Sequence, residues 1–86
     1  MKLQLVLAGP YQACIKTKQI WSDICQQHGL NLDITDIDSN TGKALEQSLN
    51  IKSFPALIVD QQVKAVGHPS EVAAEKLINN LTQKQD

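Results

Sequence analysis

Hydrophobic and polar residues repeat along the chain with two different periods, and the change of period predicts where strands and helices lie. Near-continuous apolar runs at 2–8 and after Pro55 are typical of strands buried on both faces. The run 30–38 alternates between apolar and polar positions, as a strand with one covered face does. Residues 11–28 follow the helical period, with an inward stripe made of Cys14, Thr17, Trp21, Ile24, Cys25 and His28.

Glycine, proline and small polar residues set the boundaries between these runs. Gly9-Pro10 breaks the first strand, and Gly29 occupies the usual position just after a helix. Ser39-Asn40-Thr41 supplies the N-cap candidates of a short helix, and Ser70 is the candidate N-cap of the last helix. We therefore predict strands at 2–8, 30–38, 56–60 and 63–66, with 61–62 as a tight connection. Helices are predicted at 11–28, from the cap candidates at 39–41 to about 49, and at 71–81, the last with Val72, Leu77, Ile78 and Leu81 facing inward.

The resulting order βαβαββα predicts an α/β fold. A βαβ unit requires parallel strands, whereas two strands joined by a tight connection are antiparallel. We expect a four-stranded mixed sheet flanked by helices on both faces. The 86 residues are enough for one small domain. We expect that domain to span 1–86, with a frayed tail at 82–86.

Composition excludes several classes of function. The apolar content of 42% supports one core, and aromatic residues are only 3%, so that core must be built from Leu, Ile, Val and Ala. A net charge of −1 gives no electrostatic case for nucleic acid or an anionic membrane. The first apolar run is too short for a signal peptide, and no run is long enough to span a bilayer. We expect a cytoplasmic location and a monomer or weak dimer.

The two cysteines do not form a disulfide with each other. Cys14 and Cys25 lie eleven residues apart in one predicted helix, which is about 16 Å along its axis. A disulfide requires Cα atoms within about 7 Å. The distant His28 and His68 give no metal-ligand spacing with these cysteines, so we expect neither a metal nor a cofactor.

The chain's other feature of chemical interest is the segment Ile51-Lys52-Ser53-Phe54-Pro55-Ala56-Leu57. Proline cannot donate to a sheet ladder, so Pro55 must stand at the start of the strand that follows. The segment resembles the thioredoxin superfamily, in which a run of this kind carries a cis-proline facing the redox site. The resemblance implies a cis Phe54–Pro55 bond, with the Phe54 backbone facing outward beside the start of the first helix. An ordinary trans proline opening a strand is the alternative.

The segment 9–17 extends this resemblance, which spans essentially the whole chain and is similar to short thioredoxin-like or glutaredoxin-like redox proteins. These proteins read Gly-Pro, then Cys-x-x-Cys, then Lys-Thr, and the resemblance continues in Gly67-His68-Pro69-Ser70. Aligned on Cys14 and the following Lys-Thr, the chain keeps the second cysteine and has Tyr11 in place of the first. In the family the first cysteine attacks and the second resolves the mixed disulfide, so the attacking thiol is missing in this alignment.

Two interpretations of Cys14 remain open. A one-residue shift of the loop would make Cys14 the nucleophile of a monothiol Cys-x-x-Thr site, with Thr17 in the place of the resolving cysteine. Against this, Cys14 lies on the core stripe, about a turn inside the predicted helix, where the helix dipole contributes less. A thiol buried among apolar groups reacts poorly. We expect Cys14, like Cys25, to be packed as a small hydrophobic residue.

The functional hypothesis is a thioredoxin-like protein that has lost the dithiol motif and binds a protein or peptide. Its binding residues would be Tyr11, Gln12, Ser53, Phe54 and Pro55, with an extended ligand added alongside Phe54. The alternative is a monothiol thiol-disulfide oxidoreductase in which Cys14 is catalytic and forms mixed disulfides with glutathione or a protein. A third hypothesis is a noncovalent partner subunit or an intermolecular disulfide dimer through either cysteine, the latter disfavoured in a reducing compartment.

Overall fold

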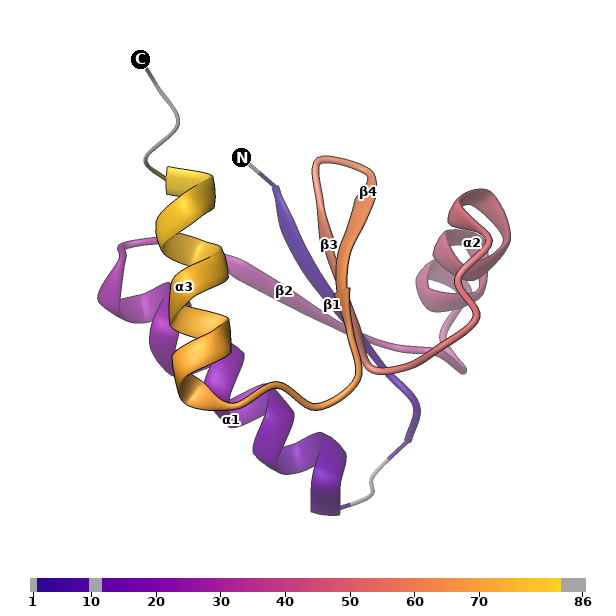
Figure 1. Cartoon of the computed structure of the whole chain (residues 1–86). Helices are drawn as coiled ribbons and strands as arrows, with labels where there is room; N and C mark the ends of the chain where they lie inside the picture. Colours follow the sequence, from indigo (N-terminus) through magenta and orange to yellow (C-terminus); the bar gives the residue numbers. More distant parts are fainter. Residues whose placement is uncertain (1, 10–11, 83–86) are drawn as a thin grey trace.

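The computed structural model describes residues 2–9 and 12–82, and it has the predicted order of strands and helices (Figure 1). The boundaries lie within two residues of the predicted ones, apart from the shorter second strand and the turn discussed below. The elements are β1 (Leu3–Leu7), α1 (Gln12–Gln27), β2 (Leu32–Asp36), α2 (Asn40–Leu49), β3 (Ala56–Val59), β4 (Gln62–Val66) and α3 (Glu71–Thr82).

The four strands form one mixed sheet in the order β2-β1-β3-β4. β1 is parallel to β2 and antiparallel to β3, and β3 is antiparallel to β4. Helices α1 and α3 lie side by side on one face of the sheet, and α2 lies on the other (Figure 1). The predicted α/β fold, a four-stranded mixed sheet with helices on both faces, is confirmed.

Each face of the sheet carries its own apolar core. Under α1 and α3, the largest buried side chain is Trp21, which packs with residues of β1 and β3 such as Leu5 and Leu57. On the opposite face, Leu45 of α2 packs with Val6 and with a second set of strand residues. All four residues of β3 are buried, because this strand is central in the sheet and covered on both faces.

Local sequence explains both ends of α2. The Ser39 side chain accepts a hydrogen bond from the Gly42 N–H, as an N-cap does. Asn50 ends the helix in the left-handed conformation with φ 55°. Gly42 is buried so closely against the preceding loop that an added Cβ would lie 2.9 Å from the Ile37 Cα and the Asp36 carbonyl carbon.

Two details differ from the sequence predictions. The β3–β4 turn is made by Asp60 and Gln61, both at positive φ, and Gln62 already belongs to β4 instead of the turn. In α3, Val72 was predicted to face inward, but it is 79% exposed. The buried positions are Ala74 and Ile78, because the helix packs on α1 through the face that carries the small alanine.

Candidate functional site

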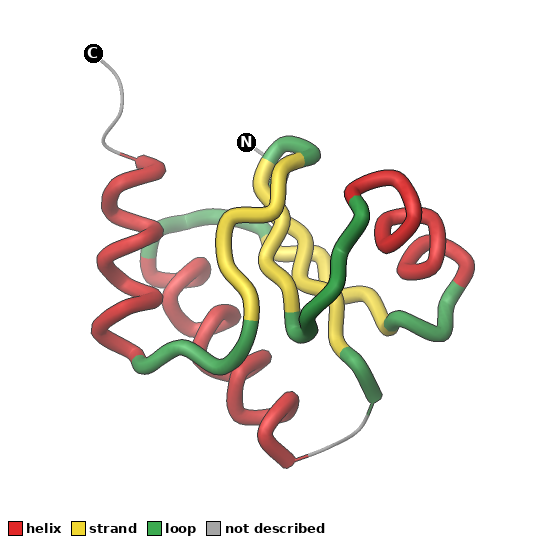
Figure 2. Tube along the Cα trace, turned by 45° about the vertical axis from the view of Figure 1, so that its right-hand side comes forward, coloured by secondary structure: helices red, strands yellow, loops and turns green. Residues whose placement is uncertain are grey.

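Three segments far apart in the sequence meet at one end of the sheet. The register pairs Val6 with Ala56 and Ala56 with Val66, so the end of β1, the start of β3 and the end of β4 lie next to one another. Figure 2 shows the loops before β3 and after β4 at the end of the sheet where the chain leaves β1 for α1. We call residues 12–17, 52–55 and 66–70 together the loop edge.

Two hydrogen bonds hold the loop edge together. The Gly67 N–H donates to the Pro55 carbonyl over 2.8 Å, which ties the turn after β4 to the segment before β3. Thr17 Oγ1 and His68 Nδ1 lie 2.6 Å apart, and this bond ties the same turn to α1. The Thr17 side chain is only 1% exposed, whereas His68 is exposed. The turn at Gly67 and His68 is therefore the bridge between the other two segments.

The residues predicted to bind a partner occupy this edge where the structure describes them. Gln12, the first residue of α1, is exposed, and so is Ser53. Phe54 is half-buried, Pro55 is buried, and the peptide bond between them is cis. Within residues 2–9 and 12–82, no hydrogen bond is made by the backbone N–H or C=O of Phe54. Tyr11 lies outside the described residues.

The fold and the loop edge can now be compared with known proteins. A family model described as "Thioredoxin domain" matches residues 1–79. The chain belongs to the thioredoxin domain family. Its fold is similar to the solution structure of the oxidised thioredoxin from Plasmodium falciparum, with a TM-score of 0.63 and 18% identity over 93% of this chain and 81% of that one. No curated protein matches the chain closely enough to count as a relative.

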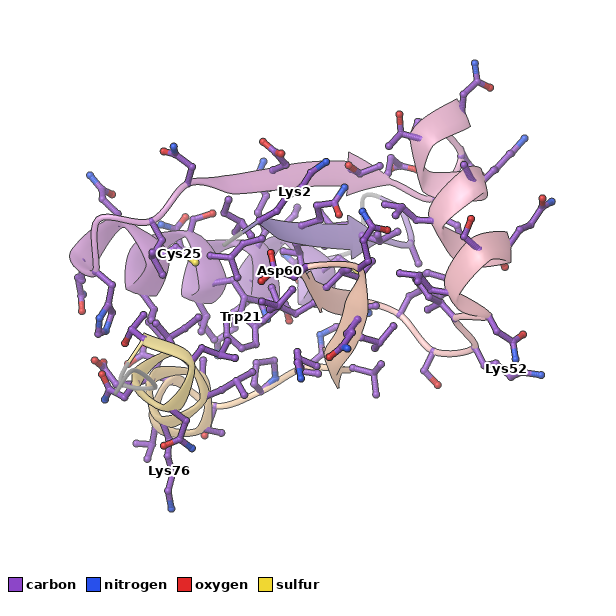
Figure 3. The ribbon with its side chains drawn as sticks, turned by 90° about the horizontal axis from the view of Figure 1, so that it is seen from above. Lys2, Trp21, Cys25, Lys52, Asp60 and Lys76 are labelled. Carbon is purple, nitrogen blue, oxygen red and sulfur yellow. The ribbon has the colours of Figure 1, made fainter. Side chains whose placement is uncertain are left out.

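In this thioredoxin domain, both cysteines are free and buried. Cys14 is 6% exposed, although α1 begins at Gln12 and Cys14 is its third residue. The thiol therefore lies within the first helical turn, where the helix dipole is strongest, and not about a turn inside the helix. Cys25 is deeper, between α1 and the sheet (Figure 3), and burial raises the pKa of its thiol.

Neither a metal-binding cluster nor a membrane-spanning helix is found in the described part of the thioredoxin domain. In residues 2–9 and 12–82, no three His, Cys, Asp or Glu side chains gather as they would around a metal ion. Among the described helices, none combines the length and apolar character needed to cross a membrane. His28 Nε2 and Glu75 Oε2 lie 3.3 Å apart and connect α1 to α3, which is a structural contact between helices.

Sequence reasoning missed Thr17 and His68 as a pair. Thr17 was placed on the inward stripe of the helix, and His68 was placed in a turn, but their contact spans 51 residues. The available signal was Thr17 itself, a hydroxyl-bearing residue in a mostly apolar stripe, because a buried hydroxyl needs a hydrogen-bond partner.

Proposed function

We propose that this thioredoxin domain binds extended segments of other proteins along the backbone of Phe54, without dithiol chemistry. The observation that carries the proposal is the loop edge itself. The hydrogen bond from Gly67 to Pro55 ties the segment that contains Phe54 to the turn after β4, and the bond between Thr17 and His68 ties that turn to α1. In the part of the chain that the structure describes, the backbone N–H and C=O of Phe54 have no partner.

An extended peptide can satisfy both of these backbone groups. Backbone donors and acceptors are strong hydrogen-bonding groups, and a strand added alongside Phe54 would pair with them as in strand addition. Exposed Ser53, which precedes Phe54, and exposed Gln12, the first residue of α1, would contact the peptide's side chains. Tyr11 immediately precedes α1 and would add a ring and a hydroxyl group to the same contact.

The positions of the thiols support binding in place of dithiol exchange. With the chain aligned on Cys14, Tyr11 stands where the attacking cysteine of the family would be. Cys14 is buried, and Cys25 lies three turns further along the same helix in the core. A helix of this geometry separates the two sulfur-bearing residues by about 16 Å, too far for a disulfide between them.

An NMR titration tests the proposal. A ¹⁵N-labelled protein is titrated with short, extended peptides that contain no cysteine. We expect the amide signals of Ser53, Phe54 and Gly67 to shift, while those of Glu75 and Asn79 on α3 serve as the internal control. Shifts confined to α3 or to α2, or no shift with any peptide, would contradict the proposed function.

The alternative is a monothiol oxidoreductase, and one observation favours it: Cys14 lies in the first turn of α1, where the dipole stabilises a thiolate. Its thiolate would attack one sulfur of a disulfide, such as oxidised glutathione, to form a mixed disulfide and release the other sulfur as a thiolate. Alkylation of a Cys25→Ala variant distinguishes the two functions, because Cys14 is then the only thiol. Protection until denaturation supports the binding module, and rapid modification of the folded protein supports the enzyme.

A further inference from the structure

Helices α1 and α3 form a narrow groove where they lie side by side (Figure 1). Its volume is about 120 Å³, and it is lined by Ile20, Asp23, Ile24 and Gln27 of α1 and by Glu71 and Glu75 of α3. The α1 residues are spaced as i, i+3, i+4 and i+7, so they share one face of the helix, and the α3 residues are one turn apart. The groove is therefore one surface built by two helices, and none of its lining residues belongs to the loop edge.

The groove has an apolar inner wall and a charged mouth. Ile20 and Ile24 are buried, whereas Asp23, Gln27 and Glu71 are exposed. Pockets that hold small-molecule ligands usually have about 300–1,000 Å³, which is well above the volume of this groove. The space therefore suits a single long side chain better than a whole small molecule.

The groove carries three carboxylates and no lysine. Glu71 and Glu75 are four residues apart on α3, a spacing at which like charges repel each other. In the part of the chain that the structure describes, the only ion pair within 4 Å joins Glu75 to His28, which is charged only when it is protonated. Asp23 accepts a hydrogen bond of 3.0 Å from the neutral side chain of Gln19. The described residues therefore leave the negative charge of the groove largely uncompensated.

The end of α1 adds to this negative potential. Gln27 is the last residue of α1, and the last turn of this helix contains no basic side chain. The C-terminus of a helix carries a partial negative charge that favours cations near its last turn. Carboxylates and a helix end thus favour a cation at the same place.

An exposed apolar side chain lies beside the groove. Val72 is 79% exposed and lines an open hollow of about 450 Å³ on α3, which shares Glu71 and Glu75 with the groove. Lys76 and Asn79 complete this hollow and do not line the groove. Covering a valine removes apolar surface from water and stabilises a complex. A protein segment can fill the groove with one side chain and cover Val72 with the next, which a free cation cannot do.

We propose that the α1–α3 groove receives an arginine side chain of a partner protein, an interaction separate from the loop edge. The methylene stem of an arginine packs on apolar surface while its head stays near water, and it would lie against Ile20 and Ile24. Its guanidinium group is always charged, is more weakly hydrated than an ammonium group and has five N–H donors, so it can bind Asp23 and Glu71 together. An apolar neighbour of the arginine would cover Val72.

Three matched peptides, titrated into ¹⁵N-labelled protein, test this inference. The first contains an arginine beside a leucine, the second replaces the arginine by uncharged citrulline, and the third replaces the leucine by serine. We expect the first peptide to shift the amide signals of Asp23, Gln27 and Glu71 and to bind about fivefold or more tightly than the citrulline peptide, because exposed ion pairs contribute small amounts that add up. This advantage should shrink at high ionic strength. The serine peptide should bind about threefold more weakly than the first, because it leaves Val72 uncovered.

Protein variants locate the origin of the preference. Combined Asp23→Asn and Glu71→Gln substitutions should remove most of the advantage of arginine over citrulline. Asp33→Asn is the matched control and should leave the advantage unchanged. Asp33 of β2 pairs with Gln4, which points to the α2 face of the sheet because its neighbours in β1 pack under α1 and α3. All three substituted positions are exposed, so the variants should fold normally.

The outcomes separate this inference from the proposed function. Equal affinity of the arginine and citrulline peptides, or a preference that persists in the double variant, would overturn the assignment of the groove. Equal affinity of the leucine and serine peptides would overturn the contact with Val72 and with it the protein partner. Shifts confined to the loop edge would also overturn the inference and leave the proposed function intact, and for this reason the loop-edge titration uses peptides without arginine.

Discussion

Replacement of Thr17 should affect peptide binding at the loop edge much more than the unfolding free energy of the protein. Thr17→Val keeps the shape of a side chain that is 1% exposed but removes the hydroxyl group that bonds to His68. Losing the bond costs about 1 kcal/mol of unfolding free energy, and burying an additional methyl group returns up to about 0.8 kcal/mol. The His68 ring is exposed and can hydrogen-bond to water instead, so the substitution leaves no buried polar group without a partner and adds no further loss of stability.

Thr17→Ser is the matched control, because it keeps the hydroxyl group and loses the methyl group. Removing a buried methyl group costs about 1 kcal/mol. Urea denaturation should therefore find Thr17→Ser equal to or less stable than Thr17→Val. Both variants should stay folded, because a chain of this size has a total stability of roughly 4–13 kcal/mol.

Peptide binding should rank these variants in the opposite order. Thr17→Val frees the turn at His68, so we expect altered His68 ring signals in NMR and peptide affinity reduced by about fivefold, the equivalent of one hydrogen bond. Thr17→Ser should bind like the parent protein. The reasoning is refuted if Thr17→Val keeps full affinity and unchanged His68 signals, or if Thr17→Ser loses as much affinity as Thr17→Val.

Three further substitutions test the packing, each by denaturation. Gly42→Ala should destabilise the protein by about 1–3 kcal/mol because its Cβ would meet the backbone at Asp36 and Ile37; the gain of about 1 kcal/mol usual for Gly→Ala in a helix would contradict this. Gln4→Met should stabilise by about 1 kcal/mol or more, because Gln4 Oε1 is buried without a partner among the described residues; an unchanged stability would show that the oxygen is satisfied. Burial raises the pKa of the Cys25 thiol, so the folded state holds this proton more tightly than the unfolded chain, and stability should fall as pH rises above the ordinary thiol pKa. The Cys25→Ala variant should lose less stability between about pH 8 and about pH 10, and an equal loss would refute this assignment.

The order of elements could be predicted because strong local signals separate them. Gly9, Gly29 and Pro55 interrupt the apolar runs at positions where the structure has loops. The placement of the predicted binding residues at one sheet end also follows from the order of strands, since antiparallel neighbours bring the start of β3 beside the end of β1.

Details that depend on long-range packing could not be predicted. The contact between Thr17 and His68 spans 51 residues and leaves no periodic signal. The exposure of Val72 depends on which face of α3 meets α1, and the small Ala74 that decides it carries little hydrophobic signal. The turn at Asp60 and Gln61 lacks the glycine or asparagine that usually marks two positive φ angles.

Amide hydrogen exchange at Phe54 tests the central claim most directly. If its N–H has no partner in the free protein, it should exchange quickly, at a rate close to that of an exposed loop amide. Adding a peptide that binds the loop edge should slow this exchange specifically, while amides in α2 such as Leu45 keep their rates. A Phe54 amide that is already protected in the free protein, or one that a bound peptide leaves equally fast, would contradict backbone pairing at this position.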